Sequence, residues 1–527
     1  MKLRISLFLL LFTSYSFGFS QTNEKEALIY GEVYSLKPKE NIRFLLWNDV
    51  FEMSTKEEPK QDSIIPLNRA SVYAGAISPN GRDFNLHISN DILPAWISFE
   101  DTLDGFSYGP YLLSPSDSIK IMFDQRKQQV NFGGPSKHSF EMASRLNSLI
   151  DQAWFENSNM IDFSAFSDIQ PELLSKLSDN NKKFRREVIP ILDRSERITK
   201  MNQNLALAKS NDFIQTAQYF RSRVSEATFS TLMIEFYSQI YKKVFYGFYG
   251  YYFGDLTEKA PELIDSFSRF FEFMESEIDS LSAIYNPVFS PTYLKMQENR
   301  ILGKSMIESK SFFEISKLES NPLIREKILA GYFLQRNVII KEGLGDFTKF
   351  LYEVNDPQLK ERLQVWHLAS TPGLQVPDYS FIDDSDNEVR ISDFKGKIVL
   401  INFWLTGCSA CKYFNQHHLK RIVDDYKSDS DVIVLSLSLD SKREIWLKSK
   451  KSDIYSPNEV IQLWTGYEGK SSDHPYLAYF NITSAPQLQL IDQEGRLFRL
   501  GISEKTYSSI KSEIESLKEN FSSTIYP

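Results

Sequence analysis

The spacing of hydrophobic and polar positions changes twice along the chain, and the changes divide it into three regions. In the first region, short β-prone runs such as Leu28–Tyr34, Ile42–Trp47 and Ile119–Phe123 are separated by turn residues rich in Pro, Asn, Gly and Asp. Short runs divided in this way are typical of an antiparallel β-sandwich or a small barrel. We therefore expect a β-rich domain over residues 21–137.

The second region, residues 138–368, has apolar residues at three- and four-residue spacing. This period is clear in segments 202–220, 226–245 and 261–284, and it predicts amphipathic helices and a helical domain. Aromatic residues are dense over 245–253. We interpret that run as helix–helix core packing; an aromatic-lined groove for a peptide or client protein is the alternative.

The third region, residues 369–527, alternates strand and helix patterns. The nearly continuous apolar runs Ile398–Trp404 and Val432–Leu439 are typical of buried strands, and the segment Lys412–Tyr426 between them is expected to be helical. Strand, helix and strand in this order predict a right-handed crossover and a parallel pair. Further along, 487–500 is expected to form a hairpin around a Gly-containing loop, and 504–521 a last helix.

The first twenty residues have the layout of a cleavable signal peptide. Lys2 and Arg4 precede the apolar run Ile5–Phe12, and small residues stand before Gln21. The apolar run is shorter than the roughly 20 residues that span a bilayer. We therefore expect cleavage near Ser20 and a mature protein that is periplasmic or otherwise extracytoplasmic; an uncleaved anchor is the alternative.

Charge and cysteine usage narrow the function further. The full chain has 60 Lys+Arg and 69 Asp+Glu. Cleavage of the signal peptide removes two basic residues, which leaves 58 against 69 and a net charge of −11. An acidic surface argues against nonspecific binding to nucleic acid. The only two cysteines, Cys408 and Cys411, lie three positions apart, so a bridge between them closes almost no loop and adds little stability. A chemical role is therefore favoured.

The position of the cysteine pair indicates what that chemistry is. Cys408 lies between the end of a predicted strand and the start of a predicted helix, where unpaired backbone N–H groups and the helix dipole stabilise a thiolate. Cys411 lies one turn further, within reach of a mixed disulfide on Cys408. We therefore expect Cys408 to be the nucleophile and Cys411 the resolving thiol.

Two other interpretations of the cysteine pair are disfavoured. A zinc site with His417 and His418 is disfavoured because His417 lies roughly 9 Å further along the same helix than Cys411. We expect no metal, and we place both histidines at solvated helix positions. A pair of buried structural thiols is disfavoured by the strand–helix junction.

Residues 372–520 resemble the extracytoplasmic thioredoxin-like proteins of the TlpA/ResA type, which are related to the redoxins and the AhpC/TSA proteins. Four pieces in the right order carry this resemblance: Pro377-Asp378-Tyr379-Ser380, Ile391–Lys397, the Asn-Phe-Trp-x3-Cys-x2-Cys core at 402–411, and Ala485-Pro486 before Leu490-Ile491-Asp492. The resemblance implies a multidomain chain with a C-terminal α/β thioredoxin-like fold. Residues 21–368 resemble the β-rich and helical modules that often precede such domains, and we expect them to dock a partner or to dimerise.

The resemblance also implies a substrate-binding surface. Pro486 is then a cis-proline that faces the cysteine pair, and Ala485 offers backbone hydrogen bonds to an extended substrate strand. Trp404 and Gly407 complete the expected substrate-binding residues. The partners are then exported protein thiols and disulfides and a membrane-bound or periplasmic electron donor, with no nucleic acid and with a homo-oligomer left open. No cofactor is expected beyond the redox-active disulfide itself.

The chain departs from the family pattern at several positions near the cysteines. Gly407 stands where a Trp usually precedes the first Cys, which opens the surface beside the nucleophile. Asn402 replaces the buried Asp that accepts a proton in thioredoxins, and an Asn side chain cannot take that proton. Phe414 stands where a Glu often follows the second Cys, and Ser409-Ala410 replaces the usual dipeptide between the cysteines.

Three functions remain open on the sequence. The first is an exported thiol–disulfide oxidoreductase that acts as a reductase or an isomerase. The second is a thiol peroxidase, which is disfavoured because Ile401 and Leu405 occupy the Pro and Thr/Ser positions of that class. The third is a non-enzymatic exported binding module with a degenerate redox domain.

Overall fold

The computed structural model describes most of the chain in segments. These are residues 26–35, 40–55, 59–69, 81–100, 107–127, 129–157, 160–162, 189–191, 193–248, 256–257, 260–336, 344–466, 474–482, 484–501 and 506–525. The expected signal peptide, residues 1–20, and its cleavage site lie outside them.

The chain divides into two compact units, Met1–Lys310 and Ser311–Pro527. Four helices that follow residue 310 therefore belong to the same unit as the C-terminal sheet: α10 Phe312–Ser316, α11 Pro322–Arg336, α13 Leu344–Glu353 and α14 Pro357–Ser370. The domain boundaries expected at residues 137 and 368 stay predictions.

The N-terminal part of the first unit holds two sheets. Their strands are β1 Glu26–Tyr34, β2 Asn41–Trp47, β3 Gln61–Pro66, β4 Asn68–Arg69, β5 Arg82–Ser89, β6 Ala95–Glu100, β7 Ser107–Leu113, β8 Ser118–Asp124 and β9 Gln129–Gly133. The sheet orders are β4-β5-β1-β8-β9 and β3-β2-β6-β7. Phe99 of one sheet packs against Phe84 and Phe123 of the other, with ring centroids 5.8 and 5.3 Å apart, so the two sheets face each other across an aromatic core.

One strand pair in this part differs from the antiparallel expectation. β1 pairs with β8 in parallel, whereas its other neighbour, β5, is antiparallel. Strand pairing is nonlocal, so the alternating pattern within each strand predicts a half-buried strand but not the direction of its neighbour.

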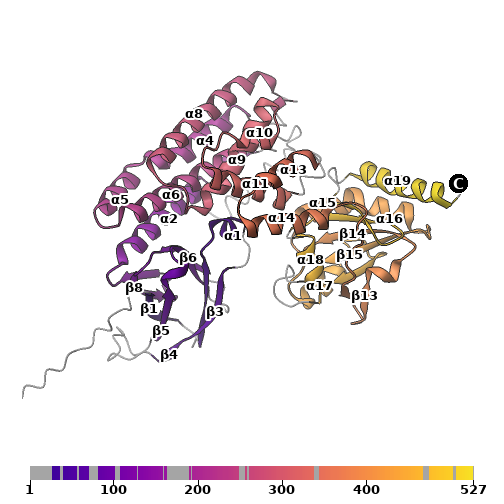
Figure 1. The fold of residues 1–527 in the computed structure, drawn as a ribbon, viewed down its shortest axis with the longest axis horizontal. Coiled ribbons are helices and arrows are strands. Elements are labelled where there is room, and N and C mark those ends of the chain that lie inside the picture. Colours follow the sequence, from indigo (N-terminus) through magenta and orange to yellow (C-terminus); the bar gives the residue numbers. More distant parts are fainter. Residues whose placement is uncertain are drawn as a thin grey trace, which may run out of the picture. The chain divides into compact units, whose positions relative to one another are not determined.

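The remaining described part of the first unit is mostly helical, as the three- and four-residue spacing predicted. It also holds two short strands, β10 Met160–Asp162 and β11 Ile189–Ile191, which pair in parallel. The helices are α2 Lys137–Asn157, α4 Glu196–Ala206, α5 Asn211–Arg221, α6 Glu226–Gly247, α8 Ile264–Ile284 and α9 Pro291–Glu308, with the short α1 Val50–Thr55 in the β-rich part (Figure 1). The segment 202–220, whose spacing predicted amphipathic helix, is shared between α4 and α5. It is divided because the hydroxyl of Ser210 accepts the N–H of Phe213 and begins a new helix.

The aromatic run that begins at Phe245 supports core packing where it is described. Phe245 and Phe248 are both fully buried, and both rings meet Phe271 of α8 edge-on, at 5.2 and 5.1 Å between centroids. Residues 249–253 lie outside the described part of the chain, so the groove interpretation stays untested there.

The second unit contains a seven-stranded mixed sheet of order β13-β12-β16-β15-β14-β17-β18. Its strands are β12 Ser380–Ile382, β13 Glu388–Arg390, β14 Ile398–Trp404, β15 Val432–Ser438, β16 Ile461–Trp464, β17 Gln487–Ile491 and β18 Leu497–Leu500. β14 and β15 pair in parallel, as the strand–helix–strand pattern predicted, and β17 and β18 form the predicted hairpin.

Helices cover both faces of this sheet. They are α15 Ser409–Phe414, α16 Lys420–Tyr426, α17 Arg443–Lys450, α18 Pro475–Tyr479 and α19 Tyr507–Ile525 (Figure 1). Side chains of α16 and α19 pack on Leu400 and its neighbours, whereas α18 packs on the face of Val399 and Ile401. β14 is therefore buried on both sides, which is why its sequence is apolar without alternation.

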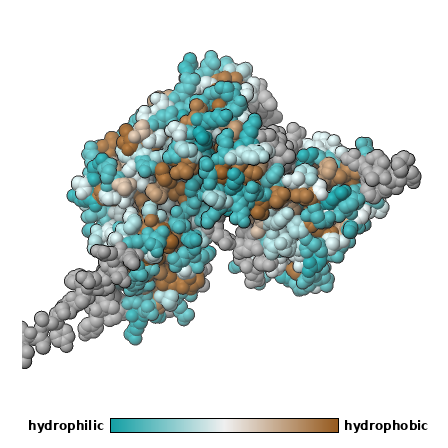
Figure 2. Space-filling view, in the orientation of Figure 1, coloured by the Kyte–Doolittle hydropathy of each residue, from teal (hydrophilic) through white to brown (hydrophobic). Residues whose placement is uncertain are grey.

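Hydrophobic residues occur in small groups on the visible face of each unit, among a majority of hydrophilic ones (Figure 2). None of the described helices combines the length and the apolar content that a bilayer span requires.

Candidate active site

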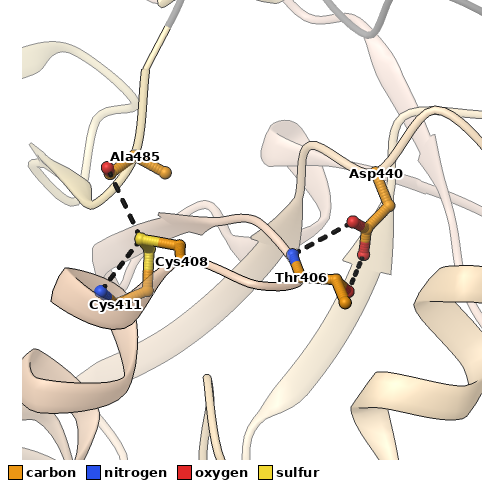
Figure 3. Close-up of a disulfide and its surroundings, with 5 residues drawn as sticks. All are labelled: Thr406, Cys408, Cys411, Asp440 and Ala485. Atoms are coloured by element: carbon orange, nitrogen blue, oxygen red, sulfur yellow. Dashed lines mark hydrogen bonds between the residues drawn. A yellow bond between two sulfur atoms is a disulfide. The ribbon is translucent and has the colours of Figure 1, made fainter. Parts of the chain in front are cut away.

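Cys408 and Cys411 form a disulfide at the junction of β14 and α15. β14 ends at Trp404, three residues turn, and Cys408 then takes the N-cap position of the helix with extended backbone angles. Its sulfur accepts the backbone N–H of Cys411 at 3.0 Å, as the dashed line in Figure 3 marks. An N–H group at a helix N-terminus stabilises negative charge, so this contact favours a thiolate on Cys408 after reduction.

The two sulfur atoms differ in access to solvent. Cys408 is half-buried and lies between the exposed Gly407 and Ser409, whereas Cys411 is 1% exposed. A Cβ atom added to Gly407 would meet nothing within 4 Å, so the surface beside Cys408 is open. Cys408 is therefore the more accessible of the two sulfur atoms, and the roles of nucleophile and resolving thiol stay predictions.

The segment opposite the disulfide contains the expected cis-proline. The Ala485–Pro486 peptide bond is cis, and the carbonyl oxygen of Ala485 lies 3.7 Å from the sulfur of Cys408 (Figure 3). In the disulfide the sulfur of Cys408 carries no proton, so it does not donate a hydrogen bond to this oxygen. In the thiol form the same two atoms can form a weak S–H···O hydrogen bond. Ala485 and Pro486 are both half-buried, and the Ala485 carbonyl lies beside the Cys408 sulfur.

Aromatic rings support the disulfide from within the domain. Trp404 is fully buried and stacks on Tyr455, with centroids 5.6 Å apart, and it forms one apolar cluster with Cys411, Trp446 and Trp464. Because its ring has no exposed surface, Trp404 supports the cysteines by packing, and a direct contact with substrate does not fit this structure.

The two positions that lack a carboxylate are both in the core. Asn402 is 1% exposed and lies opposite Ser436 on the neighbouring strand, and its amide atoms have no hydrogen-bond partner among the described residues. Phe414 is 3% exposed and packs with residues of α16 and α19. Neither side chain can accept a proton from Cys411, so the proton must leave by another route.

The two histidines after the pair lie in a π-helical turn, Asn415–Leu419, between α15 and α16. The ring of His417 packs 4.3 Å from that of Tyr413, and Nδ1 of His418 accepts the backbone N–H of Tyr507. Partial burial lowers the pKa of His418, with a smaller contribution from His417 and Arg421. Both side chains therefore have structural contacts beside the helix.

A carboxylate that the sequence did not single out lies beside the loop before Cys408. Asp440 follows β15, is 3% exposed, and accepts both the backbone N–H and the hydroxyl of Thr406 (Figure 3). A single Asp after a strand is common in sequences and carries no motif. Only the parallel pairing of β14 and β15 brings it to the loop.

The strand–helix junction with its cysteine pair, the parallel crossover and the cis-proline opposite together define a thioredoxin-like domain. The family model described as "AhpC/TSA family" matches residues 372–460. Thiol-disulfide oxidoreductase ResA of Bacillus cereus is 22% identical over 160 residues, which cover 30% of this chain and 81% of that protein. ResA of Geobacillus kaustophilus is 25% identical over 151 residues, covering 28% of this chain and 80% of that one.

A solved structure gives a further likeness. The thioredoxin domain of a thiol-disulfide oxidoreductase from Bacteroides vulgatus is 25% identical, covers 27% of this chain and 98% of that domain, and has a TM-score of 0.24. The sheet order, the strand–helix junction with its disulfide and the cis-proline give the C-terminal region the thioredoxin-like fold that the sequence motifs indicated, and its sequence is similar to the ResA-type thiol–disulfide oxidoreductases.

Proposed function

We propose that this chain is an exported thiol–disulfide oxidoreductase that reduces or isomerises disulfides of other exported proteins. The observation that carries this proposal is the pair itself: an accessible Cys408 whose sulfur accepts a helix N-terminal N–H at 3.0 Å, bonded to a buried Cys411. A nucleophile that is exposed and a partner that is hidden are what reversible dithiol exchange requires.

The proposed reaction in the reducing direction has two exchange steps. The Cys408 thiolate attacks one sulfur of the substrate disulfide, that S–S bond breaks, and the leaving thiolate takes a proton from solvent. Cys411 then loses its proton and attacks the sulfur of Cys408, which releases the second substrate thiol and forms the Cys408–Cys411 disulfide. Two electrons pass to the substrate, and a dithiol donor at the membrane or in the periplasm returns them by the reverse exchange.

Two features support a polypeptide substrate. The backbone of Ala485 lies beside the sulfur of Cys408 and can pair with an extended strand, and Gly407 leaves space next to it. We propose that Gly407, Ala485 and Pro486 contact the substrate, with no metal and no cofactor beyond the disulfide. The signal-peptide pattern before Gln21 supports a periplasmic or other extracytoplasmic location, where disulfides form and need repair.

Reduction of insulin by the purified, pre-reduced protein tests this function. Cys408→Ser removes the nucleophile and is expected to abolish the reaction. Cys411→Ser keeps the first step and blocks the second, so a mixed disulfide between Cys408 and insulin should accumulate and be visible on a non-reducing gel. Equal activity of the wild type and Cys408→Ser would contradict the proposal.

A thiol peroxidase is the second candidate, because the matching family model is that of the AhpC/TSA proteins. Ile401 stands where the peroxidase pattern has a proline and Leu405 where it has a hydroxyl residue, and Ile401 is buried on the other face of β14 from Cys411. Consumption of hydrogen peroxide by the reduced protein, measured next to insulin reduction, separates the two activities.

A further inference from the structure

The carboxylate of Asp440 makes a two-point clamp on Thr406. Oδ1 accepts the backbone N–H of Thr406 at 3.0 Å, and Oδ2 accepts its hydroxyl at 2.7 Å (Figure 3). Oδ2 also accepts the hydroxyl of Ser438 at 2.8 Å. Hydrogen bonds to a carboxylate inside a protein are shorter and stronger than neutral ones, so this clamp is stiff.

Asp440 is itself held in place. Its backbone N–H donates to the hydroxyl of Ser438, and its carbonyl oxygen accepts the indole N–H of Trp464 at 2.7 Å. Trp404 and Ser438 are opposite one another at the ends of parallel strands, so the loop after β14 and the residue after β15 meet at one edge of the sheet. The clamp therefore connects the rigid sheet to the loop before the disulfide.

The loop between β14 and α15 sets the position of the Cys408 sulfur. Thr406 is two residues before Cys408, Gly407 turns with a φ of +84°, and the N–H of Cys408 donates to the carbonyl of Leu405 at 3.2 Å. The hydroxyl of Thr406 also lies 2.8 Å from that of Ser449 in α17. Leu405 and Gly407, the other two residues of this loop, have no side chain that can hydrogen-bond, so the side-chain hydrogen bonds of the loop are those of Thr406.

We propose that Asp440 is a positioning residue for thiol–disulfide exchange, which fixes Thr406 so that the loop directs the Cys408 sulfur onto the backbone N–H of Cys411. This role rests on the proposed function. Asp440 acts through Thr406 and does not itself touch the reacting sulfur.

A direct effect of the charge has the opposite sign, which makes the proposal testable. A carboxylate near a thiolate disfavours it, so its removal lowers the pKa of the thiol. Loss of the clamp instead weakens the N–H contact that stabilises the thiolate, so the pKa of the thiol rises. Thr406→Val removes half of the clamp and leaves the charge of Asp440 in place, whereas Asp440→Asn removes the charge and keeps an acceptor for the Thr406 N–H.

The experiment measures the pKa of Cys408 in the reduced full-length protein from the pH dependence of iodoacetamide alkylation. Thr406→Val is expected to raise this pKa by about one unit, a tenfold loss of thiolate at a given lower pH. Thr406→Ser keeps the hydroxyl and should retain the wild-type value. Asp440→Asn combines the loss of the charge, which lowers the pKa, with a weaker clamp, which raises it, so its pKa should lie below that of Thr406→Val. A wild-type value in Thr406→Val overturns the positioning role.

The same domain offers a matched control. Asp378 accepts the backbone N–H and the hydroxyl of Ser392 at 3.0 and 2.8 Å, the same two-point clamp on a loop beside β12 and β13, with β16 and β15 between β12 and β14. Ser392→Ala should therefore leave the pKa of Cys408 unchanged. A shift as large as that of Thr406→Val would mean that any loosened loop has this effect and would overturn the proposal.

Two further measurements distinguish a folding defect in a variant from a loss of the positioning role. Far-UV circular dichroism and the melting temperature check each variant. If Thr406→Val does not fold, Ser438→Ala is the second variant, because it removes one hydrogen bond to the Asp440 carboxylate. It should raise the pKa of Cys408 by less than one unit. An unchanged pKa in that variant overturns the positioning role. If the wild-type Cys408 never reacts after reduction, the proposed function fails; if it titrates normally and the variants match it, only the positioning role fails.

Discussion

Gly407 shows how one residue sets both the backbone and the access at the site. Its φ of +84° lies in the region that L-residues rarely adopt, yet an added Cβ would meet nothing within 4 Å. The cost of a substitution should therefore come from backbone conformation and not from a clash. We expect Gly407→Val to lower the free energy of unfolding by about 2 kcal/mol, and Gly407→Asn by about half of that, because Asn tolerates positive φ.

Urea unfolding of the two variants checks this prediction. Equal costs for Val and Asn would contradict it, since only a conformational penalty distinguishes the two side chains at an open position.

Asn402 is the residue at which the proton acceptor of thioredoxins is missing. Its amide is buried and has no hydrogen-bond partner among the described residues. Asn402→Asp should lower the free energy of unfolding by about 3 kcal/mol at pH 7, because a carboxylate there is buried without a partner. Burial raises the folded-state pKa of such an Asp above its unfolded value, so stability is complete below about pH 4 and is lost as the pH rises.

The loss should therefore shrink as unfolding is measured at decreasing pH. Asn402→Leu, which removes the unpartnered amide without adding charge, is the control and should be close to neutral. A pH-independent loss in Asn402→Asp would mean that the carboxylate finds a partner.

At the scale of elements, a histidine begins the helix that packs on the sheet opposite α16 and α19. Nδ1 of His474 accepts the N–H of Tyr476 at the start of α18, and Nε2 lies 3.0 Å from the carbonyl oxygen of Ser380 in β12. Both contacts fit the neutral ring, with Nε2–H as donor. Burial lowers the pKa of His474, although the Ser380 carbonyl opposes this shift.

Stability should therefore fall in acid. A folded-state pKa below the unfolded value of about 6.5 means that the unfolded chain binds the extra proton first. Stability is complete above about pH 6.5 and decreases as the pH falls below it. His474→Asn keeps a good N-cap and cannot titrate, so the pH dependence between pH 6.5 and 5 should become shallower than in the wild type. His418→Asn and His367→Asn, measured in the same way, account for the other two described histidines with a lowered pKa.

The elements that the sequence predicted best are those with a local cause. The strand Ile398–Trp404 has its predicted bounds because a continuous apolar run needs burial on both faces. The break at Ser210 was missed because apolar spacing continues across it, although Ser-Asn-Asp at 210–212 is a helix-start pattern. The parallel pairing of β1 and β8 and the π-helical turn Asn415–Leu419 depend on distant contacts, such as Asn415 donating to the carbonyl of Asp453.

The site residues also divide into those with a signal in the local sequence and those that only the fold brings together. The cysteine pair and the Ala485–Pro486 segment follow from a motif and a resemblance. Asp440 could not be found, because it lies 34 positions after Thr406 in the sequence and only the sheet brings the two residues together. Trp404 belongs to the same sequence motif as the cysteines, and the motif alone does not show that its side chain is fully buried.

At the scale of the whole molecule, the redox chemistry lies in the second unit, and the two cysteines of the chain are both there. The first unit has its own core, in which Arg300 pairs with Glu275 and Asp279 between helices. We propose that this unit docks a partner or a second copy and brings the client near Cys408. A full-length protein that stays a lone monomer in gel filtration and crosslinks to no client would count against that role.

The reduction potential of the Cys408–Cys411 couple tests the central claim most directly. The full-length protein is equilibrated with glutathione buffers of increasing potential, and free thiols are counted by alkylation at each one. We predict a single reversible two-electron transition, between about −270 mV, as in thioredoxin, and about −120 mV, as in a strong oxidant. Thiols that stay oxidised or reduced across the whole series, in both directions of titration, would contradict the account.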